Sequence, residues 1–171
     1  MLKIIGAVLV LFSSSAIGFD KAAVLKKRKD NLKNIKDAVS AMEREMSFSK
    51  HEIADIFLFA ANSVQKETAK LFLSAADKIK ENPQTVGLIW EKTVWEYKDR
   101  LCFSNLQTNE LSQIFSSLGK TDYALQKRIF AAAYKTLESL IEKAEEECKK
   151  NTKLYQSFGI LTGIFICVIF M

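Results

Sequence analysis

Breakers of secondary structure are rare in this chain. It has one proline, Pro83, and six glycines among 171 residues. Four of the glycines lie within residues 1–19 or 154–171, so only Gly87 and Gly119 interrupt the middle of the chain. The middle is rich in alanine, leucine, lysine and glutamate, which form helices readily. The composition therefore predicts an all-α protein with long helices and argues against a sheet.

Metal-binding and disulfide-forming residues are also few. Cys102, Cys148 and Cys167 are unevenly spaced, and the third lies inside an apolar run. This spacing matches neither a disulfide framework nor a zinc site, and it is typical of a reducing compartment. We interpret the cysteines as small apolar side chains. His51, the only histidine, has no second ligand nearby in sequence, so we expect it to be exposed or structural.

The parts of an active site are absent from the sequence. Gly119-Lys120-Thr121 ends like a phosphate-binding loop, but Ile114 stands where that loop needs its first glycine, and a helix is expected before it. Glu43 and Glu45 flank an arginine on the polar side of a helix, without a pocket to separate their pKa values. We predict no enzyme activity, no cofactor, no metal and no small-molecule substrate.

Charge is absent from both ends of the chain. Residues 154–171 and residues 4–19 are uncharged runs. A helix that crosses the roughly 30 Å hydrocarbon core needs about 20 apolar residues, and lysines flanking a shorter run extend it by snorkelling. We predict an N-terminal transmembrane helix at 1–19, a C-terminal one at 154–171, and a water-soluble domain at 20–153.

Basic residues gather beside the two apolar runs. Residues 20–36 hold seven basic side chains and two acids, whereas acids outnumber bases 18 to 14 in residues 37–148. Lysine and arginine beside membrane segments stay on the cytoplasmic side and bind the anionic leaflet. We therefore predict a two-pass protein of the cell membrane with residues 20–153 in the cytoplasm. Because no groove-reading motif follows, we expect no nucleic-acid partner. The predicted membrane-surface residues are Lys26, Lys27, Arg28, Lys29, Lys149, Lys150 and Lys153.

The N-terminal run has an alternative interpretation. Lys3, the apolar stretch after it and the small residues at 16–18 have the layout of a cleaved signal peptide. Cleavage would make the chain an exported, tail-anchored binding module. The basic cluster that follows opposes translocation, which favours a retained helix.

Apolar periodicity predicts six helices in the middle of the chain. They lie at 20–47, from Ile53, at 64–80, at 85–102, around 111–118 and from about 121 onward. The predicted core residues of the helix at 64–80 are Leu71, Phe72, Ala75, Ala76 and Ile79. Those of the next long helix include Leu88 and Trp95, and the seam of the last helix begins with Leu125, Ile129 and Ala133. Ser49 and Glu52 have the spacing of a capping box before the second helix. Without breakers at either junction, the first and last helices are expected to continue into the membrane segments.

We expect these helices to form one antiparallel bundle. The heptad-like seams would also suit an intermolecular coiled coil, but tryptophan and phenylalanine at interior positions favour a core within one chain. In the last segment, Gly159 and Gly163 have the small-xxx-small spacing that brings membrane helices close, so self-association through them is an open alternative.

Several short runs, in this order and spacing, resemble the stage III sporulation protein AB family of endospore-forming bacteria. They are KIIGA at 3–7, IGF at 17–19, MEREMSF at 42–48, LGKTD at 118–122 with Gln126, and Asn151 with KLY at 153–155 and LTG at 161–163. The resemblance covers essentially the whole chain. Met42, Phe48 and residues 49–51 depart from the usual pattern, and these are packing or surface changes.

The resemblance implies a non-enzymatic membrane scaffold of the sporulation transenvelope complex, a secretion-like channel between mother cell and forespore. It implies a bundle similar to the cytoplasmic domain of type II secretion F proteins and a place in the outer forespore membrane. The implied partners are other sporulation complex membrane proteins and the ATPase, stage III sporulation protein AA. The matched positions Glu45, Gly119, Asp122 and Gln126 become candidates for partner contact or for helix-turn structure.

Overall fold

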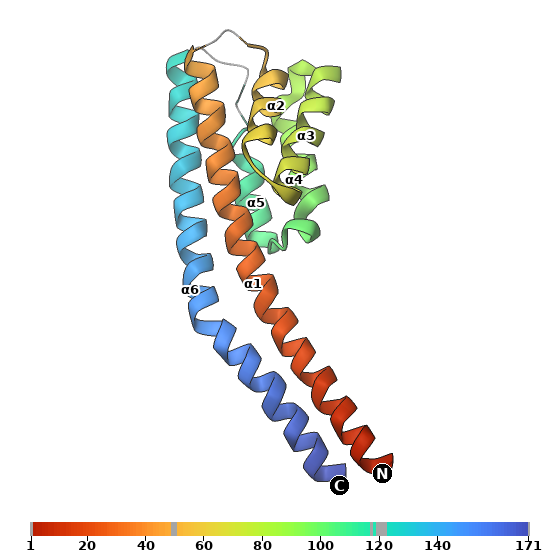
Figure 1. Cartoon of the computed structure of the whole chain (residues 1–171). Helices are drawn as coiled ribbons and strands as arrows, with labels where there is room; N and C mark the ends of the chain where they lie inside the picture. The colour runs from red at the N-terminus through yellow and green to blue at the C-terminus, as the bar shows by residue number, and fades with distance from the viewer. Residues whose placement is uncertain (1, 49–50, 117, 119–122, 171) are drawn as a thin grey trace. The chain divides into compact units, whose positions relative to one another are not determined.

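The computed structural model describes residues 2–48, 51–116, 118 and 123–170. Every regular element within these residues is helical, and no strand occurs among them (Figure 1). The elements in chain order are α1 (Leu2–Phe48), α2 (Ile53–Ser63), α3 (Lys66–Glu81), the 3-10 turn η1 (Pro83–Thr85), α4 (Val86–Leu101), α5 (Asn105–Gln113) and α6 (Tyr123–Phe170). The prediction of an all-α chain with six helices is confirmed.

The chain divides into two compact units. The terminal unit comprises Met1–Lys29 and Lys143–Met171, and the central unit comprises Asp30–Glu142. Because α1 and α6 are each one uninterrupted helix, they contribute to both units. The predicted continuation of the first and last bundle helices into the apolar ends is confirmed.

An aromatic cluster forms the middle of the central unit. Its rings come from α2, α3, α4, the turn after α5, and α6, and adjacent centroids are 5.0–6.2 Å apart. Most pairs meet edge to face, which is the favourable arrangement for the ring quadrupoles. The members are Phe57, Phe72, Trp90, Phe115 and Phe130, all at most 2 % exposed. This cluster joins α2, α3, α4, the turn after α5 and α6 in one core.

Buried side chains also complete helix ends in the central unit. The indole N–H of Trp90 donates to the carbonyl of Leu111 at 2.8 Å, and the amide of Asn31 donates to the carbonyl of Leu101 at 3.0 Å. Both carbonyls lie in the last turns of helices, where backbone donors become scarce. The Leu111 carbonyl also accepts from the Ile114 amide at 3.3 Å. Trp90 and Asn31 thus have hydrogen-bond partners for their buried polar groups, and each supplies a donor to a carbonyl near the end of a helix.

Helix ends differ from the predictions at two places. The capping box lies at Ser104 and Gln107, where side chains and backbone amides pair reciprocally at the start of α5. At α2 the N-cap position is Glu52, without a side-chain cap. The box predicted there rests on Ser49, which lies outside the described residues. α5 also ends at Gln113, earlier than predicted.

The predicted apolar seams are partly corrected by the structure. On α3 all five predicted core residues are buried, but Leu88 and Trp95 on α4 and Leu125 on α6 are exposed. Phe130, which the predicted α6 seam omits, is 2 % exposed and belongs to the aromatic cluster.

The terminal unit is an antiparallel pair of helices formed by parts of α1 and α6. A Cβ atom at Gly18 would lie 2.5 Å from the carbonyl oxygen of Tyr155 and 3.0 Å from the Cα of Gly159. The hydroxyl of Ser14 donates to the carbonyl of Gly159 at 2.5 Å. The N-terminal apolar run therefore packs on the C-terminal one within a single chain, backbone against backbone.

One helical stretch in the described part of the chain, Leu125–Ile169, is long and apolar enough to cross a membrane. This criterion concerns length and composition only. It supports membrane association through the C-terminal end. The second crossing, by residues 1–19, stays a prediction.

Candidate functional site

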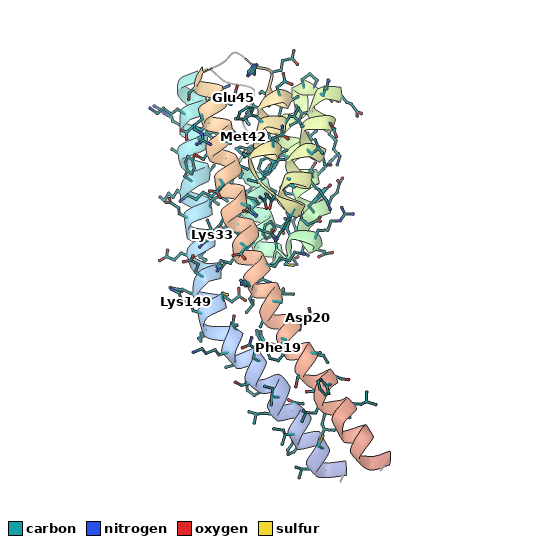
Figure 2. The ribbon with its side chains drawn as sticks, viewed as in Figure 1. Phe19, Asp20, Lys33, Met42, Glu45 and Lys149 are labelled. Carbon is teal, nitrogen blue, oxygen red and sulfur yellow. The ribbon has the colours of Figure 1, made fainter. Side chains whose placement is uncertain are left out.

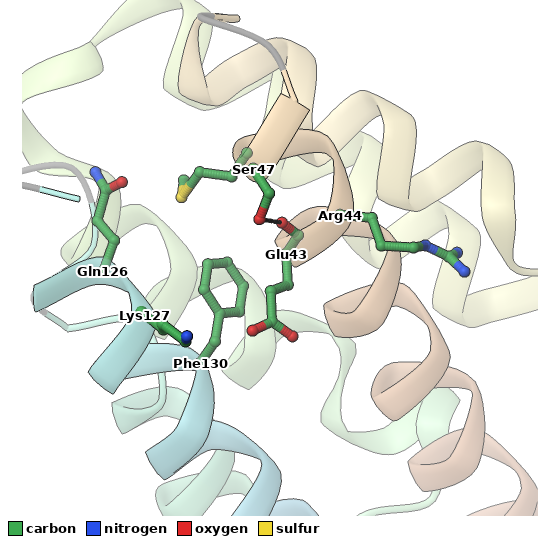
Figure 3. A pocket seen from close by; sticks show the side chains of 7 residues that line it. Glu43, Arg44, Ser47, Gln126, Lys127 and Phe130 are labelled. Atoms are coloured by element: carbon green, nitrogen blue, oxygen red, sulfur yellow. Dashed lines mark hydrogen bonds between the residues drawn. The ribbon is translucent and has the colours of Figure 1, made fainter. Parts of the chain in front are cut away.

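A hollow of about 340 Å³ lies between the last turns of α1 and the first turns of α6 in the central unit (Figure 3). Polar groups of both helices surround an apolar floor to which Met46 and the buried ring of Phe130 contribute. In Figure 3, Glu43 and Phe130 point toward one another from the two helices. The lining residues are Glu43, Arg44, Met46, Ser47, Gln126, Lys127 and Phe130. We call this hollow the α1–α6 pocket.

Tyr134, one helical turn after Phe130 on α6, has a raised pKa. Burial raises the pKa of the Tyr134 hydroxyl above its ordinary value, and the hydrogen bond that it donates to Glu43 raises it further. A contact with Ser40 acts in the opposite direction. The Tyr134 hydroxyl on α6 therefore lies close to the Glu43 carboxylate, which lines the pocket.

Glu45 and Gln126, the predicted contact residues that the structure describes, lie on the two helices that form this pocket. Glu45 is half-buried near the end of α1, where Figure 2 marks it. Its Oε1 is 2.7 Å from Nδ1 of His51. This contact joins α1 to the segment that precedes α2, so His51 has the exposed, structural position expected. Gln126 is half-buried and lines the pocket. Gly119 and Asp122 lie outside the described residues.

The predicted membrane-surface residues fall into two groups in the terminal unit. Lys26 and Lys27 on α1 are exposed, as are the three lysines at 149, 150 and 153 on α6 (Figure 2 marks Lys149). Arg28 is instead half-buried and bridges to Glu147 at 2.9 Å, and Lys29 is half-buried. Arg28 therefore joins the two helices of the unit, whereas the exposed lysines offer their charge to solvent.

The two glycines of the small-xxx-small pair both face α1. A Cβ at Gly159 would meet the carbonyl oxygen of Ser14 at 2.9 Å, and one at Gly163 would meet the Cα of Leu11 at 3.2 Å. The close approach that the spacing predicts thus occurs within one chain. Self-association through these glycines stays a prediction.

The lining of the α1–α6 pocket combines charged, polar and apolar side chains. Within the described residues, no group of three or more histidine, cysteine or acidic side chains could hold a metal ion. The pocket lining supplies a carboxylate, a hydroxyl, an amide and two basic groups, but no histidine or cysteine to act as base or nucleophile. Exposed charges around an apolar floor suit contact with another protein.

Sequence reasoning missed Lys127, Phe130 and Tyr134, and it placed Glu43 on a polar face without a pocket. The pocket exists because the end of α1 and the start of α6 meet in space, which no local pattern shows. The one available hint was the proximity of Gln126, a matched family position, to Lys127 and Phe130 along the same helix.

Comparison with known proteins decides the family. The profile of the family described as stage III sporulation protein AB matches residues 3–171. The chain belongs to the stage III sporulation protein AB family. The stage III sporulation protein AB of Bacillus subtilis (strain 168) is 23% identical over 171 residues, covering all of both chains. No solved structure matches.

Membership in the stage III sporulation protein AB family places the chain among sporulation proteins. The match includes the apolar residues at both ends as well as the central unit. The predicted resemblance is confirmed across the chain.

Proposed function

We propose that this protein is a non-enzymatic membrane scaffold of the sporulation transenvelope complex. The observation that carries the proposal is the terminal unit, in which the two apolar ends of a sporulation-family chain pack together as an antiparallel helix pair. A pair of this kind would anchor a helical domain without performing chemistry. The lining of the α1–α6 pocket, which lacks a nucleophile–base arrangement, supports the non-enzymatic role.

In this proposal both apolar runs cross the membrane and the central unit faces the cytoplasm of the mother cell, at the outer forespore membrane. Exposed lysines immediately before residue 154 and within 26–27 support this orientation, because positive charge is retained on the cytoplasmic side. The Ser14 and Gly18 contacts with α6 support retention of the N-terminal run, since removal of residues 1–18 would strip the glycines of α6 of their packing partner.

The α1–α6 pocket is the proposed docking surface for the ATPase of the complex, stage III sporulation protein AA. Arg44 and Lys127 are exposed beside an apolar floor, an arrangement in which a buried anchor residue of a partner is surrounded by charged contacts. The matched residues Glu45 and Gln126 lie on the two helices that form the pocket. Other membrane proteins of the complex would contact the terminal unit.

The docking proposal is tested with the full chain in detergent and the purified ATPase. Gln126→Ala combined with Lys127→Glu should weaken binding at least about tenfold, as expected for residues that border a central anchor. Gln65→Ala combined with Lys66→Glu is the matched control, because it makes the same two substitutions at an exposed adjacent pair that does not line the pocket. Equal binding of the two variants would reject the pocket as the docking surface.

The scaffold proposal is tested separately by extraction from sporulating cells. The chain should require detergent for release and should co-purify with other membrane proteins of the complex. Recovery of the chain in the soluble fraction without detergent would contradict the scaffold role, whatever the ATPase measurement shows.

A further inference from the structure

A second hollow, of about 390 Å³, lies along one face of α6 in the terminal unit. Its lining residues recur at the three- and four-residue steps of a single helical face: Lys150, Lys153, Leu154, Ser157, Phe158 and Leu161. Two lysines stand at one end and apolar side chains at the other. The hollow therefore begins in the last charged turn of the helix and continues into the uncharged run.

We infer that this hollow binds one anionic phospholipid. The inference rests on the proposed membrane insertion of residues 154–171. An anionic headgroup would lie between Lys150 and Lys153, and an acyl chain would follow Leu154, Phe158 and Leu161. Ser157 supplies a hydroxyl near the ester level between the two.

The length of the apolar part matches this occupant. Leu161 follows Lys153 by eight positions, which is about 12 Å along a helix. Half of the hydrocarbon core is roughly 15 Å thick. The acyl chain of a lipid whose phosphate contacts Lys153 could therefore lie against this face through most of the thickness of one leaflet.

Charge and exposure also favour a lipid. No acidic residue lines the hollow. Glu146 and Glu147 stand one turn before Lys150, outside the lining, and Glu147 pairs with Arg28 at 2.9 Å. Phe158 is 58 % exposed and Leu161 is 59 % exposed, so this apolar surface is not covered by α1. The opposite contact, between Gly159 or Gly163 and α1, leaves the lysine-bearing face open.

The site differs from general attraction to an anionic leaflet. In general attraction each exposed lysine contributes similarly. A site predicts that Lys150 and Lys153 contribute far more than Lys149 and Lys26, which are exposed at about the same level of the helix pair but do not line the hollow. The two pairs carry the same charge, so they provide a matched comparison.

The test uses the full chain in neutral detergent micelles, where no charged surface is present, with native mass spectrometry to count bound lipids. Phosphatidylglycerol should saturate at one molecule per chain. Phosphatidylcholine and soluble glycerol phosphate should bind at least about tenfold more weakly, because each lacks either the negative headgroup or the acyl chain.

Lys150→Gln with Lys153→Gln should lower phosphatidylglycerol affinity roughly ten- to thirtyfold, and Lys149→Gln with Lys26→Gln should change it less than about threefold. Phe158→Ala should also weaken binding, with no effect on the charge. Equal loss in both lysine pairs, equal binding of phosphatidylcholine, equal binding of glycerol phosphate, or a lipid-independent dimer would each overturn the site. A chain that stays soluble without detergent would instead reject the membrane proposal on which the site rests.

Discussion

The side-chain amide of Asn31 on α1 donates a hydrogen bond to the carbonyl oxygen of Leu101, the last residue of α4, at 3.0 Å. Asn31 is 4 % exposed. A buried asparagine is costly unless it is paired, and the last carbonyls of a helix have no intrahelical donor. The contact satisfies both groups and fixes the end of α4 against α1.

Replacing Asn31 with alanine should destabilise the chain by about 1–3 kcal/mol, because the Leu101 carbonyl would be buried without a donor. Asn62→Ala is the control: Asn62 is exposed near the end of α2, and its loss should change stability by less than about 0.5 kcal/mol. Chemical unfolding in detergent, followed by circular dichroism, measures both. Equal destabilisation would show that the Asn31 contact contributes nothing specific.

Cys102 ends α4 in a left-handed conformation with φ of 62°. The Cys102 amide donates to the Asp99 carbonyl and the Phe103 amide to the Lys98 carbonyl, which is the Schellman pattern usually closed by glycine. Cys102→Gly should therefore be more stable than Cys102→Ala by about 1 kcal/mol. Comparing these two variants removes the effect of losing the thiol. If alanine were as stable as glycine, strain at this position would be ruled out.

Gly18 allows α1 and α6 to touch in the terminal unit. Gly18→Val would place carbon atoms inside the space of the Tyr155 carbonyl and the Gly159 backbone, so we expect the helix pair to lose about 1–3 kcal/mol. Gly6→Val is the matched control, since a Cβ at Gly6 meets nothing within 4 Å. Unfolding in detergent should separate the two variants. A larger effect at Gly6 would contradict the packing described here.

Tyr134 gives the chain a dependence on alkaline pH. Its pKa is raised in the folded state, so above about pH 10 the unfolded chain loses this proton first and binds fewer protons than the folded one. The free energy of unfolding should therefore fall as pH rises through this range. In Tyr134→Phe the fall should be shallower. Identical profiles for the two proteins would mean that this hydroxyl does not contribute.

Much of the helical architecture follows from local sequence, but exact faces do not. The predicted α6 seam steps back by fours from Ala133 to Ile129 and Leu125, and each step of four residues turns about 40° past a full circle. The actual buried face passes through Phe130 instead. On α4, apolar residues occur all around the helix, so composition cannot show that Leu88 and Trp95 face outward.

The α1–α6 pocket was less accessible to prediction than the helices. Glu43 and Lys127 are far apart in the chain, and only the packing of α1 on α6 in the central unit brings them to one hollow. The lysine-lined hollow on α6 is different, because all its residues lie on one helix and their spacing is visible in the sequence. A site whose residues all lie on one helix can be predicted from their spacing in the sequence. A site formed by two helices can be found only when the packing of those helices is known.

Sidedness is the most direct test of the whole account. A single cysteine introduced at the exposed Lys92 of α4, in a chain whose three native cysteines are replaced by serine, can be labelled with a membrane-impermeant maleimide. If both apolar ends hold the central unit on the cytoplasmic face, inverted membrane vesicles should be labelled and intact protoplasts should not. Labelling in intact protoplasts, with protection in inverted vesicles, would contradict the cytoplasmic position of the central unit.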